Sequence, residues 1–230
     1  METFIKTPYF GILLSIFTYI LGGWISKKIK NPLFNPLLLA MFMCIAILKI
    51  FKIEYEDFNV GGQYITFLVA PATVALVVNL YKNLDLLIKN IVPVIIGVFV
   101  GAMTSVLTIY AGAKIFGWSQ ELKYSLVPKS LTTAIGTALS GEYGGIVSIT
   151  VVSIVLTGIM GAAIAPTLLK IIKVEDPVAK GISIGTTAHA VGTSRALQMG
   201  EVEGGMSGLA IALAGFISVI IIPVIIKILG

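Results

Sequence analysis

Long apolar runs separated by short polar or charged segments dominate the pattern along this chain of 230 residues. A helix needs about 20 apolar residues to cross a membrane. The pattern predicts seven such helices, at Tyr9 to Ser26, Asn35 to Ile50, Gly62 to Tyr81, Ile91 to Phe116, Ile146 to Ile172, Val178 to Gln198 and Ser207 to Ile228. The predicted fold class is an all-α integral membrane protein, with residues 1–230 forming a single membrane domain.

An eighth apolar segment, Val127 to Ser140, is rich in Thr and Ser and too short for an ordinary pass. If it crossed fully, Lys170, Lys173 and Lys180 would lie outside the cell. If it is re-entrant, they lie in the cytoplasm together with the lysines that follow the first helix, as the positive-inside rule favours. We therefore expect a re-entrant segment.

This topology makes residues 31–117 and 121–230 two units of opposite orientation, preceded by an additional N-terminal helix at residues 1–30. The middle helix of each unit carries polar interruptions, around Pro71 in one and around His189 in the other. An inverted repeat with paired interrupted helices is typical of a transporter whose binding site lies at the bilayer midplane.

Composition supports a membrane address, since 57% of the residues are hydrophobic and only 12% are charged, against about 25% charged in soluble domains. The net charge of +5 comes from scattered Lys and Arg, which mark topology and form no nucleic-acid surface. The single cysteine, Cys44, excludes an intrachain disulfide and is expected to pack in an apolar run. The N-terminus has no signal cleavage site or organelle leader, so a multi-pass protein of the bacterial plasma membrane is expected.

One candidate anion site lies in Pro128-Lys-Ser-Leu-Thr-Thr133. A proline suits the first turn of a helix, whose N-terminal N–H groups attract anions. Lys129 would add a charge, and Ser130, Thr132 and Thr133 would add hydroxyl donors. The alternative is that Lys129 only extends to the membrane interface.

His189 is the only histidine and lies in the middle of an apolar helix, beyond the reach of either end. An imidazole there can hold a proton or pair with an anion. Thr187 and Thr193 would face the same site, and Gly192 would let the helix unwind. The alternative is a core histidine bonded to a backbone carbonyl.

Arg195 is the only arginine, and its guanidinium fork matches a carboxylate. It follows His189 by six positions, so the two share a pocket only if the helix breaks near Gly192. Alternatively Arg195 pairs with Glu201 or Glu203 in a following turn.

The first half would supply uncharged partners, Asn35 and Thr73, beside helix-breaking prolines. The apolar segments hold no catalytic triad, metal-spaced cluster or carboxylate pair. We therefore expect no enzyme and no cofactor, apart from coupling to H⁺ or Na⁺.

The chain resembles the LrgB/CidB family, holin/antiholin-like bacterial membrane proteins related to the plastid glycolate/glycerate transporter. The matching segments are Pro128 to Gly136, Thr157 to Pro166 and Asp176 to Gly204, with NPLLLA and APATVAL in the first half. The chain has Ala134, Ala188 and Ser194 where the family usually has Pro, Ser and Ala. The resemblance implies transport of small monocarboxylates such as pyruvate, glycolate or glycerate, often with a small LrgA-like membrane subunit.

The leading hypothesis is a secondary transporter of small carboxylate anions that works by alternating access, with a proton held on His189. The alternative is a holin/antiholin-like pore or a regulator of murein hydrolase export and cell lysis. Expected partners are the anion, the lipid bilayer, an LrgA-like subunit and a second copy of the chain in a dimer, with no nucleic acid.

Overall fold

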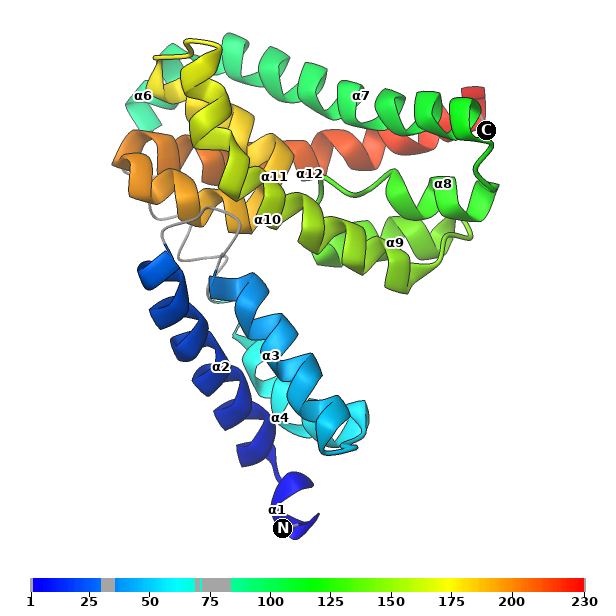
Figure 1. Ribbon diagram of the computed structural model, residues 1–230. Coiled ribbons are helices and arrows are strands. Elements are labelled where there is room, and N and C mark those ends of the chain that lie inside the picture. The colour runs from blue at the N-terminus through cyan, green and yellow to red at the C-terminus, as the bar shows by residue number, and fades with distance from the viewer. Residues whose placement is uncertain (1, 30–35, 69–70, 72–83, 230) are drawn as a thin grey trace. The chain divides into compact units, whose positions relative to one another are not determined.

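The computed structural model describes residues 2–29, 36–68, 71 and 84–229, and every regular element within them is a helix (Figure 1). The contacts divide the chain into two compact units, Met1–Ala75 and Leu76–Gly230. The all-α prediction is confirmed. The boundary after Ala75 lies inside the predicted repeat unit 31–117, so the compact units are not the predicted repeats.

The first unit contains α1 (Glu2–Ile5), α2 (Pro8–Ile29), α3 (Pro36–Ile50) and α4 (Tyr55–Phe67). Helix α2 packs against both α3 and α4. The Thr18 hydroxyl lies 3.2 Å from the sulfur of Cys44, which joins α2 to α3. Helix α4 begins earlier than the predicted helix Gly62 to Tyr81, most of whose remainder lies outside the described residues.

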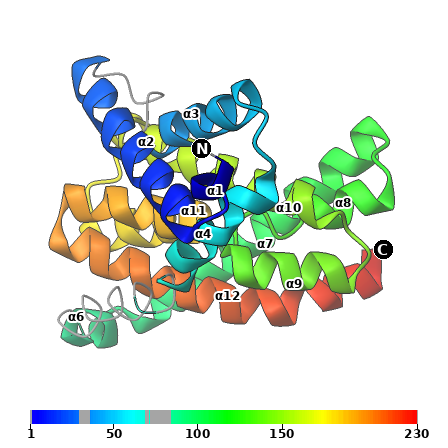
Figure 2. The same ribbon diagram turned by 90° about the horizontal axis from the view of Figure 1, so that it is seen from below.

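The second unit contains α6 (Leu84–Lys89), α7 (Ile91–Phe116), α8 (Gln120–Leu126), α9 (Thr133–Glu142), α10 (Val147–Ile171), α11 (Pro177–Met199) and α12 (Glu201–Leu229). Helices α7 and α12 pack side by side (Figures 1 and 2). Among the described residues of the whole chain, four helices are long and apolar enough to cross a membrane, namely α2, α7, α10 and α12. This confirms a membrane protein but not all seven predicted passes.

Helix α11 reverses direction at His189, whose φ of 40° and ψ of −134° are not helical. A Cβ added to Gly192 would lie 3.1 Å from the carbonyl oxygen of Ile184, although residues eight apart in a straight helix are about 12 Å apart. The two arms of α11 contact the start of α12 in opposite orders. As the contacts on α12 advance from Gly204 to Ser207, those on the first arm of α11 advance from Gly181 to Gly185. On the other arm they run backward, from Leu197 to Thr193. The arms are therefore antiparallel, and both lie on the start of α12.

The structure thus differs from the predicted single pass at Val178 to Gln198. The break lies at His189 and not at Gly192, and the chain turns back because the positive φ of His189 redirects the helix axis. The expected turn through Glu201 and Glu203 is also absent, since both residues belong to the first turn of α12. Helix α11 is called the second hairpin below, with His189 at its tip.

The first hairpin consists of α8, residues 127–132 and α9. Its arms are antiparallel, because the Ser125 hydroxyl at the end of α8 accepts a 2.7 Å hydrogen bond from the N–H of Ile146, which follows α9. At the other end of α9, Gly136 packs on Pro128. Neither arm can cross a bilayer, since α9, the longer, has ten residues. This shape agrees with the predicted re-entrant segment, whose immersion in lipid stays a prediction.

Pro128 does not open a helix, contrary to the prediction from its position in the sequence. Residues 127–132 form a non-helical connection, in which the Leu131 N–H donates to the Pro128 carbonyl at 3.0 Å. The helix begins at Thr133, with Thr132 as its N-cap. Local turn bonds hold the connection, so the helical N-terminus lies beyond Lys129.

The two hairpins enter the second unit from opposite ends. On α7, Gly97 faces Ile182 and Gly101 faces Thr186, so the first arm of α11 runs parallel to α7. On α10, Gly158 faces Val191 and Gly161 faces Ala188 at the tip of α11, while Leu169 packs on Ile184. Helix α10 therefore runs opposite to α7 and α12. Buried residues of the first hairpin pack with the C-terminal parts of α7 and α12, and those of the second with the N-terminal parts.

Each hairpin is followed by a long helix, and the two hairpin-plus-helix segments have opposite directions and related sequences. Thr132-Thr-Ala-Ile-Gly-Thr137 corresponds to Thr186-Thr-Ala-His-Ala-Val-Gly-Thr193, with two extra residues in the second copy. Pro166 and Lys170 of α10 likewise match Pro223 and Lys227 of α12. The second unit thus contains two hairpin-plus-helix segments of opposite direction that share short stretches of similar sequence, and the predicted inverted repeat stays a prediction.

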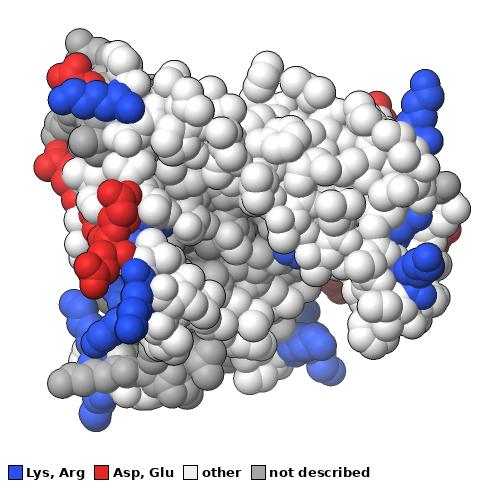
Figure 3. Space-filling view, turned by 90° about the horizontal axis from the view of Figure 1, so that it is seen from above, with Lys and Arg blue, Asp and Glu red and all other residues white. Residues whose placement is uncertain are grey.

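Several charged side chains of the second unit lie at helix ends. Lys114, Lys170 and Lys227 are in the last turns of α7, α10 and α12, and Glu201 and Glu203 are in the first turn of α12. Figure 3 shows the same tendency on one face of the molecule, where charged side chains gather toward the edges. This distribution is the one that a lipid solvent requires.

We expect Gly11→Ala to destabilise the first unit. Its new methyl group would meet the Phe58 carbonyl, and the Gly61 Cα at 3.0 Å, and overpacking typically costs about 1–3 kcal/mol. A methyl group added to Gly23 in the same helix would have no neighbour within 4 Å, so Gly23→Ala should be neutral or stabilising by about 0.5–1 kcal/mol. Thermal unfolding in detergent measures both changes, and equal effects would contradict the close α2–α4 contact.

Candidate functional site

The tip of the first hairpin carries a small polar cluster. The Lys129 ammonium donates to the hydroxyls of Ser105 and Ser130, at 3.3 Å in each case, and the two hydroxyls lie 2.9 Å apart. Ser105 belongs to α7 and lies near its middle. Lys129 is half-buried, so its charge is held within the unit and does not extend to a helix end.

The tip of the second hairpin places an imidazole beside this cluster. The His189 ring lies within hydrogen-bonding reach of the backbone of Ile154 in α10 and of Lys129, as the core-histidine alternative expects. A Cβ on Gly158 would lie 2.8 Å from the ring. His189 is only 5% exposed, and its Nε2 has no hydrogen-bond partner among the described residues. The structure therefore brings together two of the predicted site residues, Lys129 and His189, one from each hairpin.

Thr193 holds the reversal in place. Its hydroxyl donates to the His189 carbonyl at 3.0 Å and lies 2.7 Å from the Ser207 hydroxyl of α12. Thr193 is 1% exposed and Ser207 is fully buried. Both hydroxyl contacts of Thr193 are used within the protein, so its place in the structure is that of a positioning residue for the tip.

A small cavity adjoins the hairpin tips. Its polar lining comes from Ser105 of α7, Ser130 of the first hairpin, Thr186 of α11 and Ser218 of α12. The volume is about 10 Å³, which leaves room for about one water molecule. The Thr186 hydroxyl oxygen is buried and has no hydrogen-bond partner among the described residues. A buried polar group without a partner is costly, and here two of them, in Thr186 and His189, lie at the tip of one hairpin.

The arrangement contains a positive charge and no matching negative charge. Within the described part of the chain, Lys129 bonds only to serine hydroxyls, and no carboxylate lines the cavity. An ammonium group has three donors and no acceptor. The ammonium and hydroxyl donors at the tips match an acceptor-rich anion.

The other predicted residues lie around this centre or away from it. Thr132 is half-buried at the N-cap of α9, while Thr133 and Thr187 are exposed. Arg195 is exposed on the second arm of α11 and donates to the Gln198 side chain at 2.8 Å. The structure does not bring Arg195 to Lys129 or His189. Asn35 and Thr73 lie outside the described residues.

Comparison with known proteins agrees with this architecture of apolar helices. Residues 15–228 match the LrgB-like family. The chain belongs to this family. The antiholin-like protein LrgB of Bacillus subtilis (strain 168) is 37% identical over 225 residues, covering 97% of each chain. The protein of the same name from Bacillus mycoides (strain KBAB4) is 36% identical and is covered to 98%. No solved structure matches the chain.

Membership in the LrgB-like family confirms the resemblance seen in the sequence. The names of the relatives describe antiholin-like proteins and not enzymes. They support the antiholin-like alternative more directly than carboxylate transport, because none of them names a substrate.

Sequence reasoning missed several hydroxyls of this LrgB-like chain. Ser105, Thr186, Ser207 and Ser218 lie in the polar cluster, line the cavity or support the tip. Each lies in an apolar helix, where a hydroxyl commonly bonds to its own backbone. The correspondence between Thr132–Thr137 and Thr186–Thr193 is the one sequence feature that marks Thr186.

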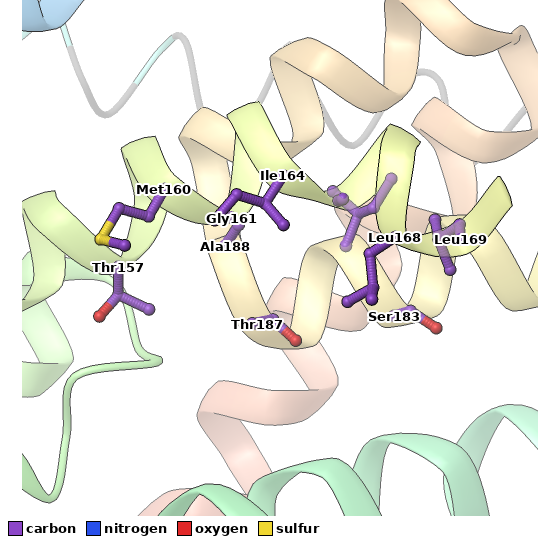
Figure 4. Close-up of a pocket in the computed structure, with 11 residues that line it drawn as sticks. Thr157, Met160, Gly161, Ile164, Leu168, Leu169, Ser183, Thr187 and Ala188 are labelled. Atoms are coloured by element: carbon purple, nitrogen blue, oxygen red, sulfur yellow. The ribbon is translucent and has the colours of Figure 1, made fainter. Parts of the chain in front are cut away.

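A second pocket of about 370 Å³ lies between α10 and α11 and is mainly apolar. Figure 4 shows Met160, Ile164 and Leu168 of α10 facing a space bordered by Ser183 and Thr187 of α11. Its lining has no charged side chain. The charged candidate site is therefore the tip region and not this pocket.

The strain at His189 predicts that glycine is more stable than alanine at this position, the reverse of their order in a regular helix. Its φ and ψ lie close to those that glycine prefers in a tight turn, so His189→Gly should be more stable than His189→Ala by about 1–3 kcal/mol. In an ordinary helix, alanine is the better residue by about 1 kcal/mol.

Ala190 provides the matched control, since it is the next residue, is exposed and has helical dihedrals. Ala190→Gly should lower stability by about 0.5–1 kcal/mol. The unfolding midpoints of His189→Gly, His189→Ala and Ala190→Gly in detergent measure the order of their stabilities. If His189→Ala were the more stable of the two His189 variants, the reversal at this residue would be refuted.

Proposed function

We propose that this LrgB-like protein is a secondary transporter of small carboxylate anions, which bind where the two hairpin tips meet. The observation that carries the proposal is the Lys129 ammonium, held inside the second unit by two serine hydroxyls without a carboxylate partner among the described residues. A charge at membrane depth is costly. A bound carboxylate would offset that cost by supplying the missing countercharge.

The remaining polar groups favour a substrate with a second oxygen next to its carboxylate. The Thr186 hydroxyl and the His189 Nε2 both lack partners among the described residues, and both can bond to a hydroxyl or keto oxygen. The cavity admits about one water molecule, so only a small ligand fits after a modest movement of the tips. Small hydroxy- or keto-monocarboxylates such as pyruvate, glycolate and glycerate meet these conditions.

The geometry of the hairpins supports alternating access. The first arm of α11 extends about 18 Å and α9 about 15 Å, against a hydrocarbon core of about 30 Å. Tips entering from opposite ends therefore meet near the midplane. Inverted repeats with broken helices around a central site support transport by movement of one repeat against the other. A proton on His189, or a sodium ion, would couple uptake to a gradient across the plasma membrane.

The second candidate is an antiholin-like regulator of murein hydrolase export and cell lysis, which the names of the relatives favour. Apolar side chains exposed along α7, α10 and α12 provide surfaces for a small LrgA-like subunit or for a second copy of the chain. The two candidates differ in how solutes cross the membrane. A carrier binds its solute and saturates, whereas a pore does not.

Substitution of the central charge tests the site. Lys129→Gln should reduce uptake of labelled pyruvate or glycolate into proteoliposomes at least about tenfold, because one charge-assisted hydrogen bond contributes about 1.5–3 kcal/mol. Lys123→Gln is the matched control in the same hairpin, since the Lys123 ammonium lies over the rings of Tyr110 and Tyr124, at 4.7 Å and 5.0 Å. Arg195→Gln should have a smaller effect than Lys129→Gln. Unchanged uptake by Lys129→Gln would refute the site.

The concentration dependence of uptake separates a carrier from a pore. Because a small ligand gains at most about 1.5 kcal/mol per heavy atom, we expect saturation at micromolar to millimolar carboxylate. Unlabelled pyruvate inside the vesicles should accelerate entry of the labelled anion. A linear rate, together with leakage of unrelated sugars, would instead support the pore.

A further inference from the structure

A groove of about 520 Å³ runs between the first halves of α7 and α11. Its wall on α7 includes Asn90, Gly97 and Gly101, and its wall on α11 includes Asp176, Ser183 and Thr187. The two glycines of α7 let α11 approach closely, since a Cβ on Gly97 would lie 3.6 Å from Ile182 and one on Gly101 would lie 2.8 Å from Thr186. The groove is thus a partly polar channel beside the second hairpin, and it begins at the ends of α7 and α11 that bear Asn90 and Asp176.

Thr186 connects this groove to the cavity at the hairpin tips. It lines both spaces, and its hydroxyl is one of the two buried polar groups at this tip without a partner among the described residues. The constriction is tight, since a Cβ on Gly101 would lie 2.8 Å from the Thr186 methyl carbon. A small rotation or shift of Thr186 therefore separates an open groove from the Lys129 cluster.

The opposite side of the cavity is closed. Val106, Val127, Leu131 and Ile222 line it there and belong to one buried apolar cluster. These side chains are 2–4% exposed. Passage toward the C-terminal ends of α7 and α12 would require the first hairpin to separate from both helices.

We infer that the groove is the route by which the carboxylate reaches the hairpin tips, and that this structure represents the state open to the cytoplasm. The inference rests on the proposed transport function and adds its route and direction. The side follows from Lys170, Lys173 and Lys180, which lie where α10 ends and α11 begins, because such clusters mark the cytoplasmic face.

Two serines of α11 allow a matched test. Ser183 lines the groove and Ser194 does not. Both are exposed, and each hydroxyl donates to the carbonyl four residues earlier, at 2.7 Å for Ser183 and 3.2 Å for Ser194. Ser183→Cys and Ser194→Cys, each made in a Cys44→Ala background, would be treated with an anionic, membrane-impermeant methanethiosulfonate reagent. The reagent would be added to inside-out and right-side-out vesicles, and labelling would be followed by mass.

We expect the reagent to label Ser183→Cys from the cytoplasmic side about 100-fold faster than Ser194→Cys, because a charged reagent does not enter hydrocarbon. Labelling of Ser183→Cys should then abolish pyruvate or glycolate uptake relative to the same variant before labelling, whereas treatment of Ser194→Cys should not. Equal labelling rates, labelling of Ser183→Cys only from the outside, or undiminished uptake after labelling would each overturn the route. If none of the unlabelled proteins transported carboxylate, the proposed function would fail instead, while the labelling rates would still report where the groove opens.

Discussion

The reversal of α11 at His189 is the constraint on which the rest of the second unit depends. Both arms must lie on the first turns of α12, and they do so because Gly181 and Gly185 let the first arm meet the α12 backbone directly. Thr193 and Ser207 then fasten the second arm. Because both arms are fixed on α12, His189 must adopt its strained dihedral angles to connect them. Close packing thus over-determines a backbone conformation that a non-glycine residue would otherwise avoid.

The same reversal creates the electrostatic character of the site. Because α11 turns back near the middle of α7, α10 and α12, its tip meets the tip of the first hairpin, and the His189 ring lies beside the Lys129 backbone and ammonium group. The groups around Lys129 are hydroxyls, which stabilise its charge without neutralising it. Among the described residues, no carboxylate pairs with this ammonium group.

Much of the architecture could be predicted from the sequence, because apolar length and charge position are direct consequences of lipid as a solvent. Helices α2, α7, α10 and α12 lie close to their predicted ranges, and Val127 to Ser140 belongs to a hairpin. The reversal could not be predicted in the same way. Periodicity describes residues along a straight axis, whereas the turn at His189 depends on contacts with α12, which are close in space but leave no periodic pattern in the sequence.

The candidate site was likewise predicted only in part from the sequence. Lys129 and His189 were predicted because ionisable residues inside apolar segments are rare and costly, and the structure brings them together. Arg195 was predicted on the same ground but lies on the second arm with Gln198, since the reversal occurs at His189 and not at Gly192. Ser105 and Ser218 were missed because a lone hydroxyl in an apolar helix does not distinguish a ligand from a residue bonded to its own backbone.

The two hairpin tips have related sequences but different turns. Thr132-Thr-Ala is followed directly by Ile-Gly-Thr in the first copy, whereas His189 and Ala190 are inserted before Val-Gly-Thr in the second. The first tip consequently spreads its turn over residues 127–132, whereas the second reverses at one residue. A long, locally bonded turn and a strained single-residue turn respond differently to the same movement. The two hairpins therefore differ in stiffness, although their sequences are alike over these residues.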